Sequence, residues 1–144
     1  MYLIILSSTQ RQRPDTNPLP ALERYQGLYP SLLRSMQRRG IFPKRCDVVF
    51  VTAQGVIRAE EKVPPSDAPL TPQLARSLHE RNLETLRNIL NSKKYDEIYV
   101  NLGHNYLQSI EGFEKSTNVK ITHATGVLGR KAVHMKRWLQ EHAQ

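Results

Sequence analysis

Polar side chains and glycines follow directly after four apolar segments of the chain. These segments are residues 2–7, 47–52, 97–102 and 119–124. Short apolar runs are typical of strands covered on both faces, and parallel strands end at one edge of a sheet, where ligands bind. The ligand-binding residues that we expect at this edge are Ser7, Ser8, Arg11, Thr52, Gln54, Gly55, Asn101, Gly103, Gly126, Gly129 and Arg130.

Glycine recurs in three of these turns, at Gly55, Gly103 and Gly126. Because glycine lets the backbone approach a ligand closely, the recurrence favours a ligand site at the strand ends. Turns between strands and helices also use glycine for conformational reasons alone. The sequence leaves both interpretations open.

The segment Gly-Val-Leu-Gly-Arg-Lys at residues 126–131 opens the last predicted helix. Unpaired amides at a helix start, beside Arg130 and Lys131, suit a phosphate or a carboxylate. A solvated basic helix face is the alternative. The segment is not a Walker loop, since no Gly-Lys-Ser/Thr follows at the required spacing, and it is not a dinucleotide fingerprint.

His104 and Tyr106 are the candidate catalytic residues. An imidazole ordinarily titrates near neutral pH, and His104 follows a strand directly. A histidine at a helix start can instead simply bond the backbone. No set of His, Cys, Asp and Glu has metal-ligand spacing, so we expect no metal and no cofactor. Ser7 and Ser8 lack the Gly-x-Ser-x-Gly elbow, which disfavours a serine hydrolase.

Amphipathic segments separate the apolar ones. Residues 21–39 have apolar side chains at helical spacing, and Gly27 and Pro30 predict a break between two short helices. Thr71 is a good N-cap before proline and predicts a long helix over residues 72–92. Asn82 lies on the apolar face of this predicted helix. It is either a buried polar group with a partner or a site residue.

The alternation of strands and helices predicts one α/β domain over residues 1–144. We expect a three-layer sandwich with a four-stranded parallel sheet, strand order 2-1-3-4, and helices on both faces. After residue 103 we expect a helix that continues to about Phe113. Residues 58–70 contain three prolines and predict an extended surface loop that covers the strand ends.

The chain of 144 residues has 21 Lys and Arg against 13 Asp and Glu, a formal net charge of +8. Residues 1–50 hold eight basic and three acidic side chains, and the last predicted helix adds four more basic ones. Such a field attracts nucleic acid or another polyanion. A basic, well-solvated protein without an anionic partner is the alternative.

No apolar run is long enough to span a membrane, so we expect no membrane partner. Residues 1–6 lack a basic leader, and we expect them to form the first strand rather than a signal peptide. Cys46 is the only cysteine, which excludes an internal disulfide and predicts a reducing, cytoplasmic setting. The sequence does not determine the oligomeric state.

Several short motifs follow one another along the chain in an order that is known from other proteins. They are Tyr25 and Tyr29, Gly55-Val56-Ile57, Glu60 or Glu61 with Pro64, Gly103 with Tyr106, Gly126 with Gly129, and Trp138-Leu139. In this order the chain resembles a family of small bacterial domains related to the peroxide-stress YaaA proteins. More distantly it resembles the core domain of archaeosine synthase, whose fold is similar to that of uracil-DNA glycosylase. The resemblance implies a link to nucleobases or nucleic acid.

Two positions depart from the family pattern. Residues 7–11 read Ser-Ser-Thr-Gln-Arg where the family has Cys-Ser-x-x-Lys, and Val51 stands where the family has a serine. Chemistry that needs the family's thiol, amine or hydroxyl is therefore in doubt. Anion binding by Arg11 would be retained.

We therefore expect a domain that binds a nucleotide, nucleobase or nucleic acid at the carboxyl ends of its strands, with or without modifying it. Arg11 and the helix start at residues 126–129 would hold phosphate, while Asn101 and Gln54 would read polar edges. The alternative is a non-catalytic protein-interaction domain that kept the fold and lost the chemistry. A metal-independent hydrolase is a third hypothesis.

Overall fold

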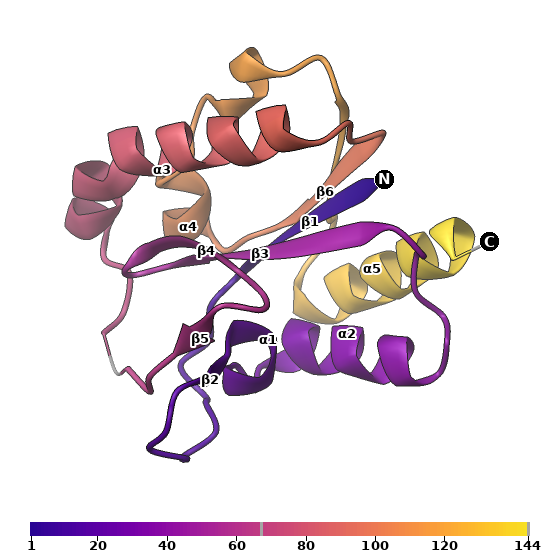
Figure 1. Cartoon of the computed structure of the whole chain (residues 1–144), viewed down its shortest axis with the longest axis horizontal. Helices are drawn as coiled ribbons and strands as arrows, with labels where there is room; N and C mark the ends of the chain where they lie inside the picture. The colour runs from indigo at the N-terminus through magenta and orange to yellow at the C-terminus, as the bar shows by residue number, and fades with distance from the viewer. Residues whose placement is uncertain (67, 144) are drawn as a thin grey trace.

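The computed structural model describes residues 1–66 and 68–143, and within them five strands form one twisted sheet (Figure 1). Its order is β4-β3-β1-β6-β7. Four of the strands are parallel and β4 is antiparallel to its neighbour β3. The bounds are β1 Tyr2–Ser7, β3 Cys46–Thr52, β4 Gly55–Arg58, β6 Glu97–Asn101 and β7 Lys120–His123.

The α/β class is confirmed and the four parallel strands lie in the predicted order, but the prediction of a four-stranded sheet is wrong. A tight turn after β3 adds the fifth strand. The Thr52 hydroxyl donates to the carbonyl of Gly55 (2.9 Å) and accepts from the amide of Gln54 (3.0 Å). Gly55 has a φ of 119°, which reverses the chain at once and pairs β4 with β3.

β1 lies at the centre of the sheet, between β3 and β6. Its Leu and Ile side chains are fully buried and alternate between two cores, Ile4 and Leu6 on one face and Leu3 and Ile5 on the other. This two-sided burial explains why the strand is apolar without alternation.

Helices cover both faces of the sheet (Figure 1). Those on one face pack against Ile4 and Phe50, and those on the other pack against Ile5 and Val100. The first layer consists of α1 Ala21–Arg24, α2 Leu28–Arg38 and α5 Leu128–His142. The second consists of α3 Pro72–Ser92, α4 His104–Gln108 and the 3-10 helix η1 Phe113–Ser116.

Most helix ends follow the predicted signals. α1 and α2 are separate helices, as the break predicted at Gly27 and Pro30 requires. The Thr71 hydroxyl accepts from the amide of Leu74 and caps α3. The prediction of one helix from residue 104 to about 113 is wrong, because Gly112 adopts a φ of 91° and divides it into α4 and η1.

The predicted loop over residues 58–70 is only partly irregular, because Lys62–Val63 forms β5 and pairs with β2, Leu19–Pro20. No helix among the described residues is long and apolar enough to cross a membrane.

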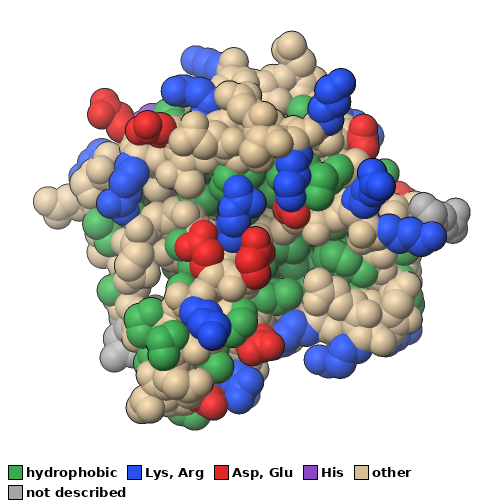
Figure 2. All heavy atoms as spheres, in the orientation of Figure 1, with side chains coloured by type: hydrophobic (Ala, Val, Ile, Leu, Met, Phe, Trp, Pro, Cys, Tyr) green, Lys and Arg blue, Asp and Glu red, His purple; other side chains and the backbone are tan. Residues whose placement is uncertain are grey.

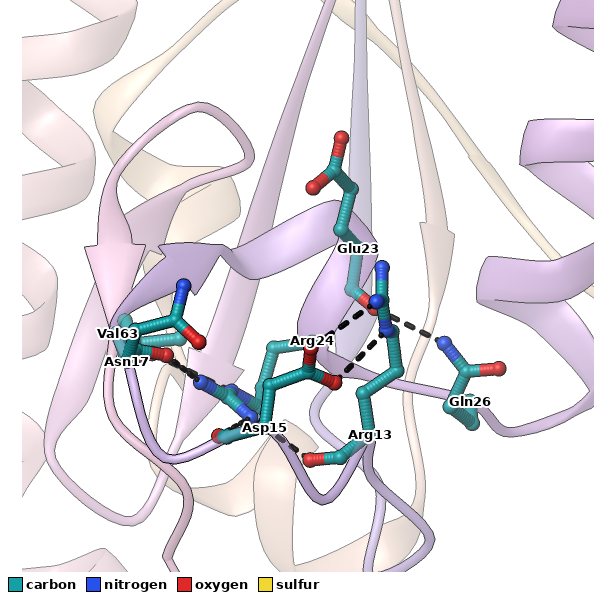
Figure 3. A network of polar contacts seen from close by, with 7 residues as sticks. All are labelled: Arg13, Asp15, Asn17, Glu23, Arg24, Gln26 and Val63. Atoms are coloured by element: carbon teal, nitrogen blue, oxygen red, sulfur yellow. Dashed lines mark hydrogen bonds and ion pairs between the residues drawn. The ribbon is translucent and has the colours of Figure 1, made fainter.

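A fully buried guanidinium, that of Arg24, organises the loop between β1 and α1 (Figure 3). It donates to the carbonyls of Arg13 (2.7 Å), Asp15 (2.8 Å), Asn17 (2.6 Å) and Val63 (3.3 Å). These four acceptors are all backbone oxygens. The planar fork of donors therefore ties the loop to β5 without a buried carboxylate.

A buried carboxylate, that of Glu97, ties β6 to β7 and α5 at the amino edge of the sheet. It accepts from the Thr122 hydroxyl (2.6 Å), the Trp138 indole (2.7 Å) and His142 Nε2 (3.1 Å). Burial alone would raise the pKa of Glu97, but these hydrogen bonds outweigh it and the pKa is lowered. His142 Nδ1 lies 2.7 Å from the Trp138 carbonyl, so the imidazole also contacts the backbone of α5.

Replacement of Arg24 with methionine should lower the free energy of unfolding by about 2–4 kcal/mol, since four backbone carbonyls lose the donors of a buried guanidinium. Urea denaturation measures this loss. The matched control is Arg13→Met, which removes only the half-exposed ion pair with Asp15 and should cost at most about 1 kcal/mol. Equal losses in the two variants would contradict the role of the buried guanidinium.

The Glu97 carboxylate should make stability depend on pH. Its pKa is lower in the folded state than the ordinary value of 4.5, so it stabilises the fold above that pH. This contribution is lost as the pH falls through the lower folded pKa. Urea denaturation followed by the fluorescence of Trp138, the only tryptophan, should show a steeper acid loss between about pH 5 and pH 3 than Glu97→Gln shows. Parallel pH profiles would refute this assignment.

Candidate ligand site at the carboxyl edge of the sheet

Three of the four predicted turns meet at the carboxyl edge. The Ser7 hydroxyl accepts a hydrogen bond from the amide of Gly103 (3.0 Å), which joins the turns after β1 and β6. Ser8, Gln54 and Tyr106, one from each of the turns after β1, β3 and β6, line one small cavity. The parallel pairing of the strands thus brings these segments together.

The turn after β7 lies at the same edge, because β7 is parallel to β6. Gly126, Gly129 and Arg130 are exposed there. Among the contacts of the described residues, none joins these three to the cavity at Ser8 and Gln54. They flank the candidate site instead of forming its walls.

Residues 64–66, which we call the strap, cross the strand ends and divide the space there. On one side the cavity at Ser8 and Tyr106 has a volume of about 20 Å³, and on the other lies a cavity of about 320 Å³. Tyr25, Gln54 and Ser66 contribute to both. The smaller space is the size of one water molecule, whereas the larger one is within the range of small-ligand sites.

Glutamine side chains hold the strap in place. Gln12 Nε2 donates to the Ser66 carbonyl (2.8 Å), and the Ser66 amide donates back to Gln12 Oε1 (3.1 Å). Gln54 Nε2 donates to the Ser66 hydroxyl (3.2 Å). The prediction that this segment covers the strand ends is confirmed. Gln12 and Ser66 were not predicted as site residues, because their pairing depends on a contact across 54 positions of sequence.

Tyrosine side chains form much of the wall. Burial, together with nearby Tyr106, raises the pKa of Tyr25 to about 12, against the opposite effect of Arg24. Burial also raises the pKa of Tyr29, against the effect of a hydrogen bond from Asn101. Both phenols therefore stay neutral, and Tyr25 lines both strand-end cavities, whereas Tyr29 is not among the residues that line them. The only sequence signal for Tyr25 and Tyr29 is their place in the family resemblance.

Three predicted ligand-binding residues make bonds within the fold. The Thr52 hydroxyl closes the turn before β4, and that of Ser7 holds the amide of Gly103. Asn101 is buried between α2 and α5, where its amide reaches the Met135 sulfur (3.8 Å) and the Tyr29 side chain. Their polar groups position the edge, while Gln54 remains exposed beside it.

His104 lies apart from the other predicted residues. It lines a cavity of about 680 Å³ next to α3 and η1, together with His79, Glu111 and Lys115. Tyr106, its predicted catalytic partner, faces the strand-end cavity instead. No carboxylate, imidazole, amine or guanidinium is present among the described residues that line the two strand-end cavities. Their walls suit binding through amides and rings, not proton transfer by a charged pair.

Exposed arginines flank this neutral site. Arg11 follows β1, and Arg81 of α3 donates to the Gln54 carbonyl (2.7 Å). Sequence reasoning missed Arg81, because nothing local to α3 indicates that it faces the turn after β3. Asn82, on the same helix, is fully buried, and its amide has no hydrogen-bond partner among the described residues. No group of three or more metal-ligating side chains occurs in the part of the chain that is described.

Gly126 and Gly129, which follow β7, differ in backbone conformation, so replacement with alanine should change the stability of the protein differently at the two positions. Gly126 has a φ of 93°, and an added Cβ would lie 2.6 Å from the Arg130 Cβ, so Gly126→Ala should destabilise the protein by about 1–3 kcal/mol. Gly129 is helical with open space around it, so Gly129→Ala should stabilise by about 0.5–1 kcal/mol. Thermal unfolding measures both. Similar effects of the two changes would contradict a conformational role specific to Gly126.

Comparison with known proteins supports the fold. No family model matches the chain, and no curated protein matches it. The crystal structure of AF0587, a protein of unknown function, is similar to this chain with a TM-score of 0.58 and 10% sequence identity. The similarity covers 96% of this chain and 44% of AF0587, so the chain spans less than half of that protein's length. At this identity the similarity shows that the two share a mixed α/β fold.

Proposed function

We propose that this chain binds nucleic acid, with unpaired bases at the carboxyl edge of the sheet and phosphates on the helices that start there. The observation that carries the proposal is the unequal charge of the two helical layers. α2 and α5 together contain one acidic residue, Glu141, against six basic ones. The six are Arg34, Arg38, Arg130, Lys131, Lys136 and Arg137.

The opposite layer is nearly balanced. α3, α4 and η1 contain Arg76, Arg81, Arg87 and Lys115 against Glu80, Glu84 and Glu114. In the view of Figure 2, basic side chains are spread over the surface with acidic ones between them. With Glu23 and Arg24 of α1 included, the helices of the first layer contain seven basic and two acidic residues. Most of the formal net charge of +8 therefore lies on this layer, as expected when one face contacts a polyanion.

The positions of these cations favour contact near the strand ends. α2 and α5 each follow a parallel strand and return along the sheet, so both helices begin at the carboxyl edge (Figure 1). Arg130 and Lys131 lie in the first turn of α5, and Arg11 follows β1. Arg34 is less available, because it donates to the carbonyls of Leu22 and Tyr25. Phosphates beside the edge would gain from the exposed cations and from the helix amides.

The walls of the edge suit bases better than phosphates. Gln54 and the tyrosine rings offer hydrogen bonds and stacking, both used with unpaired bases. Because the described residues of these walls include no charged acid–base pair, we propose binding without a chemical step. The resemblance to the YaaA-related family also favours a nucleobase or nucleic-acid ligand.

A protein-interaction domain is the second candidate function, and one observation favours it. The large apolar side chains most exposed among the described residues are Leu28 (48%), Val127 (76%) and Val133 (59%). All three lie on α2, on α5 or at the start of α5. The layer that carries the cations thus also offers apolar contacts that a protein partner could cover.

Binding to a fluorescent single-stranded oligonucleotide should be strong at low salt and fall as salt rises, as anisotropy titrations measure. The double change Arg130→Ala with Arg137→Ala should weaken binding about tenfold or more and lower the salt slope by about two. The control removes the same charge from the other layer, Arg76→Ala with Arg87→Ala, and should change affinity less than about twofold.

Equal losses in the two double variants would show attraction by net charge alone. An absence of salt-dependent binding in the unmodified chain would leave the protein-interaction domain as the better proposal.

A further inference from the structure

Gln12 makes an unusual contact for a surface-loop side chain. Its carboxamide donates to the Ser66 carbonyl and accepts from the Ser66 amide, at 2.8 Å and 3.1 Å. The Gln12 carboxamide thus pairs with the N–H and the C=O of one residue, which belong to the two peptide groups on either side of the Ser66 Cα. The edge of a nucleobase offers the same arrangement, a donor beside an acceptor, and glutamine pairs with adenine through two such bonds.

The Gln12 side chain is held in this orientation independently of the strap. Its Nε2 also donates to the Thr9 carbonyl (3.0 Å), and its backbone forms a bridge with that of Tyr25. The Arg24 guanidinium holds the following residues of the same loop. The carboxamide would therefore keep its direction if Ser66 moved away.

The strap is held weakly between two firm anchors. Pro64 and Pro65 have no amide hydrogen to donate. Among the described residues, the side-chain ties of the strap are those from Gln12 and Gln54 to Ser66, besides the local bond from the Ala68 amide to the Ser66 hydroxyl. Before it, β5 pairs with β2, and the Val63 carbonyl accepts from Arg24. After it, Leu70 is buried, and its carbonyl accepts from Asn105 (3.0 Å). A displacement of the strap would thus leave the rest of the fold intact.

Removal of Ser66 from its position would join the two strand-end cavities, of about 20 Å³ and about 320 Å³. The joined space would have Gln12 and Gln54 as polar walls and Tyr25 and Tyr106 as ring walls. The described residues that line the two cavities carry no charged side chain. A planar, uncharged ring with adjacent donor and acceptor fits these walls.

We propose that Gln12 pairs with the edge of an unpaired nucleobase and that the backbone N–H and C=O of Ser66 occupy the place of this base in the free protein. The inference rests on the proposed binding of nucleic acid and adds the residue that reads the base. The strap acts as an internal competitor, so a base binds only when the Ser66 backbone leaves Gln12. Adenine, whose N6 and N7 complement a carboxamide, should be preferred.

The test compares anisotropy titrations of labelled oligo(dA), oligo(dT) and oligo(dC) of equal length at one salt concentration. The unmodified chain should prefer oligo(dA) by about fivefold or more, and Gln12→Ala should remove this preference without changing the salt slope. Gln73→Ala, at an exposed glutamine in the first turn of α3, is the control and should keep the preference. Circular dichroism checks that each variant is folded.

Hydrogen exchange is a second measurement, and its expected result would not follow if Gln12 had only a structural role. Saturating oligo(dA) should increase exchange at the Ser66 amide, because this amide loses its acceptor, while exchange falls in the turn at Gln54. Salt-dependent binding that is equal for the three oligonucleotides, or binding without increased exchange at Ser66, would overturn the inference and leave the proposed function standing. Binding to none of them would overturn both.

Discussion

The parallel pairing of β1 with β3 on one side and β6 on the other is the constraint on which the candidate site depends. Because these strands run in one direction, the turns that follow them all lie at one edge of the sheet. The contact between the Ser7 hydroxyl and the Gly103 amide, 96 positions apart, is the direct result. The apolar character of β1 is therefore as important to the site as any polar residue in it.

A second constraint is the burial of Arg24. A charged group without contact to water is costly unless its donors are satisfied, and four backbone carbonyls meet that need here. The same bonds give an irregular, proline-containing loop a defined shape. The guanidinium holds Arg13, the residue after Gln12, and the Gln12 backbone bridges to that of Tyr25, so the loop around the candidate recognition group is fixed on both sides.

The carboxyl edge and the helical layer formed by α1, α2 and α5 have complementary properties. The described residues that line the edge carry amides and phenols and no charged side chain, burial raises the pKa of Tyr25 among them, and the strap closes the edge. The helices beside it carry the excess charge and begin at the same edge. Attraction would thus be supplied by one surface and selectivity by another, which is the usual division in nucleic-acid binding.

The sequence was sufficient to predict a helix, strand or turn where the interactions that define it are local. The apolar runs identified the parallel strands, the N-cap Thr71 identified the start of α3, and Gly27 with Pro30 identified the break before α2. The alternation of strands and helices then implied the order of the parallel strands and the edge at which polar turns gather.

Tertiary structure decided what depends on contacts between distant segments. The pairing of Gln12 with Ser66, the approach of Arg81 to Gln54 and the separation of His104 from Tyr106 have no signal in the residues around them. β4 was missed because one hydroxyl, that of Thr52, and one positive φ turn a loop into a strand. Local patterns thus determined which elements form and at which edge of the sheet they end. Packing between elements determined which side chains face one another at that edge, because hydrogen bonds depend on distance in space and not on position in the chain.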